Sequence, residues 1–154
     1  MARVCREAGA RVQSNKMLRD LNVDGISPAD GRRIEVIANG TGLFHGAQLA
    51  IDTTIVSGLR RNGTARPRAA RVDGAVLENA RKRKEDTYPE LTGEYGRARL
   101  VVFAVEVGGR WSSESFQLIR LLAKGRAEQE PEHIRLRAAT AWQRRWCGIL
   151  GIAA

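Results

Sequence analysis

The stretch from residue 33 to residue 56, RIEVIANGTGLFHGAQLAIDTTIV, contains two apolar runs that each carry one carboxylate. Glu35 lies in the first run, and Asp52 lies in the second, 17 residues later. Both runs are rich in β-branched residues, and the segment between them begins with Asn39-Gly40, which supplies positive-φ turn conformations. We therefore expect two antiparallel strands that form a β-hairpin.

An ionised carboxylate inside an apolar strand costs free energy unless a cation compensates its charge. Either each acid of the hairpin meets an arginine or lysine, or both acids share one cation. Because side chains alternate between the two faces of a strand, Asp52 and Thr54 are expected to share a face. We interpret the hairpin as a metal-binding acid pair; the alternative is a set of structural ion pairs with Arg32, Arg33 or Lys84.

The length and composition indicate one folded domain. The chain has 154 residues, of which 43% are hydrophobic and 28% are charged, as in ordinary globular proteins. Only two cysteines occur, Cys5 and Cys147, and neither a secretory signal nor an apolar run of about 18 residues is found. These features predict an intracellular, reducing environment with two free thiols.

The chain is strongly basic, with 26 Lys and Arg against 17 Asp and Glu and a net charge of +9. The excess is concentrated between Arg60 and Lys84, and an excess of this kind favours polyanion partners, most commonly nucleic acid. The alternative is a solvated basic loop. The predicted nucleic-acid contacts are Arg32, Arg33, Arg60, Arg61, Arg66, Arg68, Arg71, Lys82 and Arg83.

The remaining patterns predict the order of the elements. Before the hairpin we expect the end of a helix at 2–9, a short strand at 10–13 and an irregular connection at 14–32. After it we expect a loop at 58–74, a helix from 75 to about 88 and a buried strand at 99–107. A helix should follow Ser112, with Phe116 and Ile119 on its apolar face, and Pro131 should open a last helix. This order predicts an α/β fold bordering on α+β, with a small central mixed sheet of three to four strands flanked by helices. The predicted domain spans residues 1–130, and 131–154 form a C-terminal helical extension.

Paired carboxylates followed by a lysine suit the hydrolysis of a phosphodiester. Glu35 and Asp52 would hold Mg²⁺ or Mn²⁺ through hard oxygen ligands, and the ion would lower the pKa of its bound water. Lys84 would orient that water or neutralise the phosphorane charge, with Thr54 nearby. Tyr88 follows Lys84 by four residues and shares its helix face, and Glu106 supplies a third acid on a later strand.

Four segments resemble a known nuclease family. They are Arg-Arg-Ile-Glu (32–35), Leu-Ala-Ile-Asp-Thr-Thr-Ile-Val-Ser (49–57), Lys-Glu-Asp-Thr-Tyr (84–88) and Val-Glu-Val-Gly-Gly-Arg-Trp (105–111). Together they resemble the restriction-endonuclease-like domain that follows the reverse transcriptase in certain non-LTR retrotransposons, a member of the PD-(D/E)XK superfamily. The family pattern is Arg-Pro-Asp, a hairpin, an Asp in a Val-Ile-Asp-Val-Thr-type strand, a helix with Lys-x-x-Lys-Tyr, and a strand ending in Glu-x-Gly-Gly-x-Trp.

The resemblance implies a role for each matched residue. Glu35 and Asp52 stand at the metal-binding acids, Lys84 stands at the catalytic lysine of this subgroup, and Glu106 matches the late-strand acid. Three positions differ from the pattern: Ile34 replaces Pro, Glu35 replaces Asp, and Thr87 replaces the second Lys.

The resemblance also implies an activity and partners. The implied activity is nicking of chromosomal DNA in the nucleus, so that the exposed 3′ end primes the reverse transcriptase domain of the same polyprotein. Two alternatives stay open: a catalytically degenerate nucleic-acid-binding relic of the same fold, in which the acids pair with Arg32 or Lys84, and a small interaction domain whose basic loop binds an acidic protein.

Overall fold

A mixed four-stranded sheet forms the centre of the protein in our computed structural model, which describes residues 1–21, 23–93 and 96–152. The strands lie in the order β1-β2-β3-β4; β1 to β3 are antiparallel neighbours, and β4 runs parallel to β3. Their bounds are β1 Arg11–Met17, β2 Arg33–Asn39, β3 Gln48–Val56 and β4 Ala98–Glu106. The expected α/β fold with a small mixed sheet is therefore confirmed.

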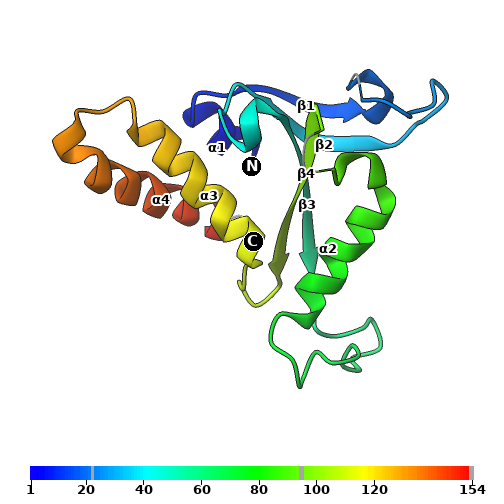
Figure 1. Ribbon diagram of the computed structural model, residues 1–154. Helices are drawn as coiled ribbons and strands as arrows, with labels where there is room; N and C mark the ends of the chain where they lie inside the picture. Colours follow the sequence, from blue (N-terminus) through cyan, green and yellow to red (C-terminus); the bar gives the residue numbers. More distant parts are fainter. Residues whose placement is uncertain (22, 94–95, 153–154) are drawn as a thin grey trace.

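Helices cover both faces of the sheet. Figure 1 shows α2 on one side of β3 and β4, and α3 and α4 on the other, while β1 and β2 cross above them. The α-helices are α1 Ala2–Glu7, α2 Ala75–Thr87, α3 Ser113–Ala127 and α4 Arg135–Ile152, and short 3₁₀ turns occupy Leu18–Asp20, Phe44–Gly46, Pro89–Leu91 and Glu132–Ile134. None of the helices in the described part of the chain is both long enough and apolar enough to cross a membrane.

Alternation along the strands divides the core into two clusters. On one face Leu49, Ile51 and Phe103 pack against α1, α3 and α4, and fully buried Trp146 of α4 belongs to this cluster. On the other face Ala50 and other sheet residues pack against α2. Because β3 and β4 contribute to both clusters, they are buried on both sides, as their apolar sequences predict. The C-terminal helix shares a core with the sheet, as an extension packed on the domain would.

The outer edge of β4 is covered by the start of α3. The backbone N–H of Val102 donates to Glu114 Oε2 at 3.3 Å, and that of Ala104 donates to Ser115 Oγ at 2.9 Å. Ser112 caps the helix as predicted, because its hydroxyl accepts the Ser115 N–H. Side chains at the helix start thus satisfy backbone donors that an open sheet edge would leave unpaired.

Three details of the sequence prediction are wrong. Strand β1 continues to Met17, whereas we expected an irregular chain from residue 14. Phe116 is 48% exposed, although we placed it on the apolar face of its helix. Pro131 precedes a 3₁₀ turn, and α4 begins only at Arg135. The two free cysteines are confirmed, and burial raises the pKa of Cys5 to about 11.

Candidate functional site

Asp52 and Lys84 are in direct contact where α2 crosses β3. Lys84 Nζ lies 2.8 Å from Asp52 Oδ2, with 31% of the lysine side chain and 10% of the aspartate side chain exposed. Asp52 Oδ2 is buried and accepts no hydrogen bond from any described residue, so the contact is ionic without being an aligned hydrogen bond. The buried acid is therefore compensated by one flexible cation, and one of its oxygens keeps an unused acceptor position.

Glu35 lies across the hairpin from Asp52. The β2–β3 pairing ends at Val36 opposite Ile51, so the next position of the same register would bring Glu35 opposite Asp52. Beyond Val36 the contact between the two strands is made by a side chain: Glu35 Oε2 accepts a hydrogen bond from the backbone N–H of Thr53 at 3.0 Å. The hairpin thus brings the two acids to neighbouring positions on adjacent strands, as the sequence predicts.

Tyr88 joins this group from the residue that follows α2. Its hydroxyl donates to the backbone carbonyl of Arg33 at 2.8 Å. Burial raises the pKa of Tyr88, and the nearby negative charge of Asp52 raises it further. Tyr88 follows the last residue of α2, and both it and Lys84 lie near Asp52.

Arg32 is held by carboxylates and a backbone carbonyl, although 31% of its side chain is exposed. Its guanidinium donates to Asp30 Oδ2 and to Glu90 Oε1, both at 2.6 Å, and also to the backbone carbonyl of Thr87 at the end of α2. These carboxylates raise the pKa of Arg32. The group lies 5.8 Å from the centroid of the Tyr88 ring. Arg32 thus ties the end of α2 to the start of β2, and its donors are already engaged.

The two carboxylates fit a hard divalent cation. Within residues 1–21, 23–93 and 96–152, no group of three or more His, Cys, Asp or Glu side chains is placed to hold a metal ion. Mg²⁺ is commonly bound by only one or two carboxylates, with water and substrate oxygens completing its coordination. Asp52 offers a buried oxygen without a hydrogen bond, and Glu35 has a second oxygen beyond the one that accepts Thr53 N–H.

Glu106 and Thr54 lie farther along the strands. Glu106 is opposite Val56, whereas Asp52 is opposite Val102, so Glu106 lies four residues farther along β4, about 13 Å at the usual rise. It is 3.8 Å from Arg110 in an ion pair. Thr54 is opposite Ala104 and partly exposed. The structure therefore does not bring Glu106 to the acid pair.

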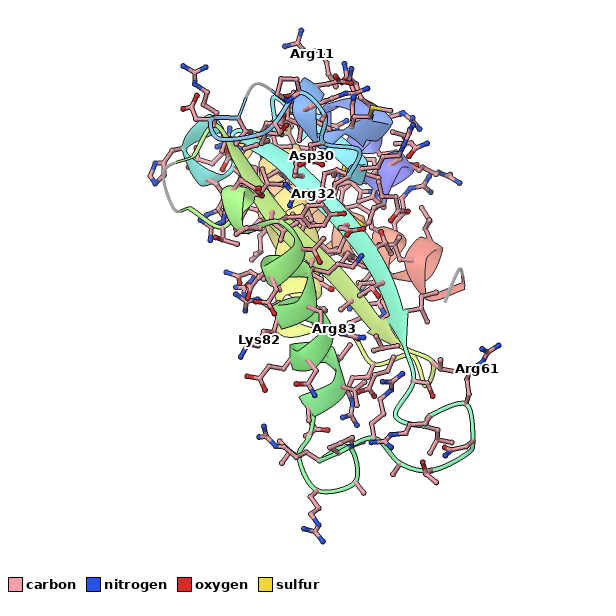
Figure 2. The ribbon with its side chains drawn as sticks, turned by 90° about the vertical axis from the view of Figure 1, so that its right-hand side faces the viewer. Arg11, Asp30, Arg32, Arg61, Lys82 and Arg83 are labelled. Carbon is pink, nitrogen blue, oxygen red and sulfur yellow. The ribbon has the colours of Figure 1, made fainter. Side chains whose placement is uncertain are left out.

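The predicted nucleic-acid contacts other than Arg32 lie near α2. Figure 2 shows Lys82 and Arg83 on the outside of α2 and Arg61 on the loop beyond one end of the helix, while Asp30 and Arg32 lie together near its other end. Most of this loop, residues 57–74, is exposed. Three of the arginines donate to backbone carbonyls: Arg66 Nε to Ser57 O at 3.0 Å, Arg33 to Asn15 O at 3.3 Å, and Arg83 Nε to Asn79 O at 3.3 Å. The loop arginines Arg60, Arg61, Arg68 and Arg71 are also in the described part.

Sequence reasoning missed the partners of Arg32. Asp30 accepts the backbone N–H of Arg32 as well as its guanidinium, the pattern of an Asx turn, and the Asp-Gly-Arg order is a signal for it. Glu90 lies 58 residues later, and no local pattern connects it to Arg32. Glu114 was also missed: burial raises its pKa, and it lies 3.8 Å from Arg81 beside the β4 edge.

A scan against protein-family models finds no match for this chain, and a search of curated proteins finds no matching sequence. The function must therefore be argued from the site itself.

Proposed function

We propose that this chain is a divalent-metal-dependent DNA endonuclease domain of a retrotransposon polyprotein, which nicks target DNA in the nucleus for target-primed reverse transcription. The observation that carries the proposal is that Asp52 of β3 contacts Lys84 of α2, while Glu35 of β2 bonds to the N–H of Thr53, the residue after Asp52. Together they supply two carboxylates for a cation and one mobile ammonium group, the set that phosphodiester hydrolysis requires.

The order of the elements supports the same family. The resemblance requires an acid before a hairpin, an Asp inside the returning strand, a helix with Lys and Tyr, and a strand that ends before Gly-Gly-x-Trp. Strands β2 and β3 supply the first two, α2 and the residue after it supply Lys84 and Tyr88, and β4 precedes Gly108. The ring of Trp111 packs edge-on against that of Phe103, with 5.3 Å between the ring centroids. The Trp of the Gly-Gly-x-Trp segment therefore packs against β4.

The chain's own residues would divide the reaction as follows. Glu35 and Asp52 would hold Mg²⁺ or Mn²⁺, which supplies charge neutralisation at the phosphate and a water of lowered pKa. Lys84 would leave Asp52 when the cation's charge replaces its own, and its ammonium group would then be available to the attacking water or the phosphorane. The exposed cations of the loop and α2 would bind the phosphate backbone. Water would add to the phosphorus and the P–O3′ bond would break, so the nicked strand would carry a 3′-hydroxyl, available to the reverse transcriptase domain, and a 5′-phosphate.

The same contacts support a second function, nucleic-acid binding without catalysis. Lys84 already neutralises Asp52, and Glu35 is already occupied by the Thr53 N–H. Both acids would then be structural, as the hypothesis of a degenerate relic predicts, and the basic loop would bind DNA through its charge alone.

Plasmid nicking separates the two functions. Supercoiled plasmid is incubated with the full chain and Mg²⁺ or Mn²⁺, and the nicked circles are quantified for the unmodified chain and for Asp52→Ala, Glu35→Gln and Lys84→Met. We expect nicking that falls at least about 100-fold in Asp52→Ala, the usual scale for removing a group that acts in the transition state. Lys124→Met is the control, because Lys124 is an exposed lysine of α3 on the other side of the sheet from α2.

Each outcome favours one function. Absence of nicking with both metals, or equal nicking by Asp52→Ala, would rule out the endonuclease. DNA affinity that falls steeply with salt in such an inactive chain would then support the binding module, because neutralised phosphates release counterions. A flat salt response, or no DNA binding, would leave the protein-interaction alternative.

A further inference from the structure

A groove lies between α3 and α4. It has a volume of about 830 Å³ and lies on the opposite side of the sheet from α2. Leu121 of α3 and Leu136 of α4 line it, and Leu136 is 83% exposed, the highest value among the exposed large hydrophobic residues of the described chain. Together, Leu121 and Leu136 give the groove an apolar lining beside its charged residues.

The groove is basic along both walls. Arg120 and Lys124 line it from α3, four residues and therefore about 6 Å apart along the helix, and Arg135 lines it from α4. Glu128 is the single acid among the lining residues. In the described part of the chain neither Arg120 nor Lys124 forms an ion pair, so both charges are available to a partner.

Two small residues also line the groove. Ala127 and Ala139 are small side chains on the two facing helices, and small residues allow a third helix to approach closely. A helix that binds in such a groove presents apolar residues at three- and four-residue spacing. Because Arg120 and Lys124 are positively charged and lie four residues apart, we expect the bound helix to carry two acidic residues four residues apart that face them.

We propose that this groove binds an acidic amphipathic helix of a partner protein. Leucine-like side chains of that helix would pack against Leu121 and Leu136, and its carboxylates would pair with Arg120 and Lys124. The proposal is independent of the nuclease function. A second copy of this chain does not supply such a helix: the acids of α2 are Glu78, Glu85 and Asp86, α3 contains only Glu114, and α4 contains none. Nucleic acid would not use the exposed leucine, and the basic loop on the other side suits it better.

The test uses the full chain and two fluorescein-labelled helical peptides of 18 residues. One carries leucines at positions i, i+3 and i+7 with flanking glutamates four residues apart, and the other replaces each glutamate with lysine. Fluorescence anisotropy measures binding to the unmodified chain, to Leu136→Asp, and to the double variant Arg120→Glu with Lys124→Glu. Arg137→Glu is the control, because Arg137 is an exposed α4 cation that does not line the groove.

We expect the acidic peptide to bind the unmodified chain at least tenfold more tightly than its lysine counterpart. Leu136→Asp should weaken binding at least tenfold, the double variant should prefer the lysine peptide, and Arg137→Glu should stay within about threefold, since an exposed charge outside the groove contributes little. Circular dichroism checks that each variant is folded.

Four results would overturn the proposal. Equal binding of the two peptides would show that charge does not determine recognition. Unchanged binding by Leu136→Asp would show that the peptide does not bind in the groove. Displacement of the acidic peptide by a DNA duplex without any effect of Leu136→Asp would identify a general polyanion surface. Sedimentation that shows a dimer of the unmodified chain, dissociated by Leu136→Asp, would assign the groove to self-association.

Discussion

Lys84 Nζ and Asp52 Oδ2 lie 2.8 Å apart, so the lysine supplies the positive charge that a cation would otherwise bring to this acid. The contact joins α2 to β3 and neutralises a side chain that is only 10% exposed. A lysine in this position stabilises the fold without a metal, but it competes with one. The residue proposed to assist hydrolysis is therefore also the residue that opposes metal binding.

Replacing Lys84 by methionine should increase affinity for Mn²⁺. Methionine keeps the apolar stem and removes the charge, so binding no longer has to overcome repulsion at the acid pair. Two unit charges at 4 Å repel by about 1 to 4 kcal/mol at an effective dielectric constant of about 80 to 20, and the double charge of Mn²⁺ doubles this value, so a gain in affinity of about tenfold or more is expected. Isothermal titration calorimetry measures the affinity, with Lys82→Met as control. An equal affinity in both variants would contradict the competition.

Arg32 should matter for stability through its ties to α2. Arg32→Met leaves Asp30 and Glu90 as neighbouring acids without their shared cation, and frees the Thr87 carbonyl. Loss of hydrogen bonds to a charged group should lower the free energy of unfolding by about 1.5–3 kcal/mol. Urea denaturation monitored by tryptophan fluorescence checks this. Arg33→Met is the control, because Arg33 makes a single 3.3 Å bond to a carbonyl. Equal urea midpoints for Arg32→Met and Arg33→Met would show that the contacts of Arg32 do not stabilise the fold.

The acid pair could be predicted from the sequence because each step is local. The two-residue period places Asp52 on one face of β3, the glycine-rich turn returns the chain beside Glu35, and helical spacing places Lys84 and Tyr88 together. None of these steps depends on long-range packing. The contact between α2 and β3 follows from the connection of two parallel strands through a helix, which the α/β order already implies.

The errors arise where tertiary contacts override local patterns. The segment that extends β1 is polar, with Ser14, Asn15 and Lys16 in succession, so its sequence lacks the pattern of a strand. Its backbone is also irregular, because Asn15 has φ 55°. Pairing with β2 nevertheless extends β1 through it, since Ser14 lies opposite Val36 and Lys16 opposite Ile34.

One residue of the predicted apolar face of α3, Phe116, was misplaced for a related reason, whereas Ile119 is buried as expected. The sequence predicts that apolar Phe116 faces the core, but Ser115 is buried there because its hydroxyl bonds to the β4 edge, and Leu118 is buried in place of Phe116. Hydrophobic spacing could not anticipate a polar residue that is recruited by a sheet edge.

The basic loop should determine the salt dependence of DNA binding. Replacing both Arg60 and Arg61 by alanine removes two exposed charges from the loop beyond α2. Each lost phosphate contact should reduce the slope of log affinity against log salt by about 1, and weaken binding similarly on all sequences. Anisotropy titrations with a labelled duplex from 50 to 200 mM salt measure the slope. Arg144→Ala, on the other side of the sheet, is the control, and an unchanged slope in the double variant would place the DNA elsewhere.

Glu7 should make the protein sensitive to acid. Its carboxylate accepts hydrogen bonds from Arg145 Nε at 3.0 Å, Trp146 Nε1 at 2.9 Å and Arg3 Nε at 3.0 Å. Chiefly through Arg145, these bonds lower the pKa of Glu7 from 4.5 to about 2. The ionised form is thus favoured in the folded state, and its contribution is present above pH 4.5 and lost as the pH falls through 4.5 toward 2.

Glu7→Gln should therefore destabilise the protein only where Glu7 is ionised. At pH 7 we expect the free energy of unfolding to fall by about 1 kcal/mol, a value reduced for solvent screening, and the difference should disappear near pH 2. Urea denaturation at pH 7, 4, 3 and 2.5 measures it. Glu132→Gln is the control, because Glu132 is exposed and forms no ion pair in the described part of the chain. A difference between Glu7→Gln and the unmodified chain that persists undiminished at pH 2.5 would show that the contact does not depend on the charge.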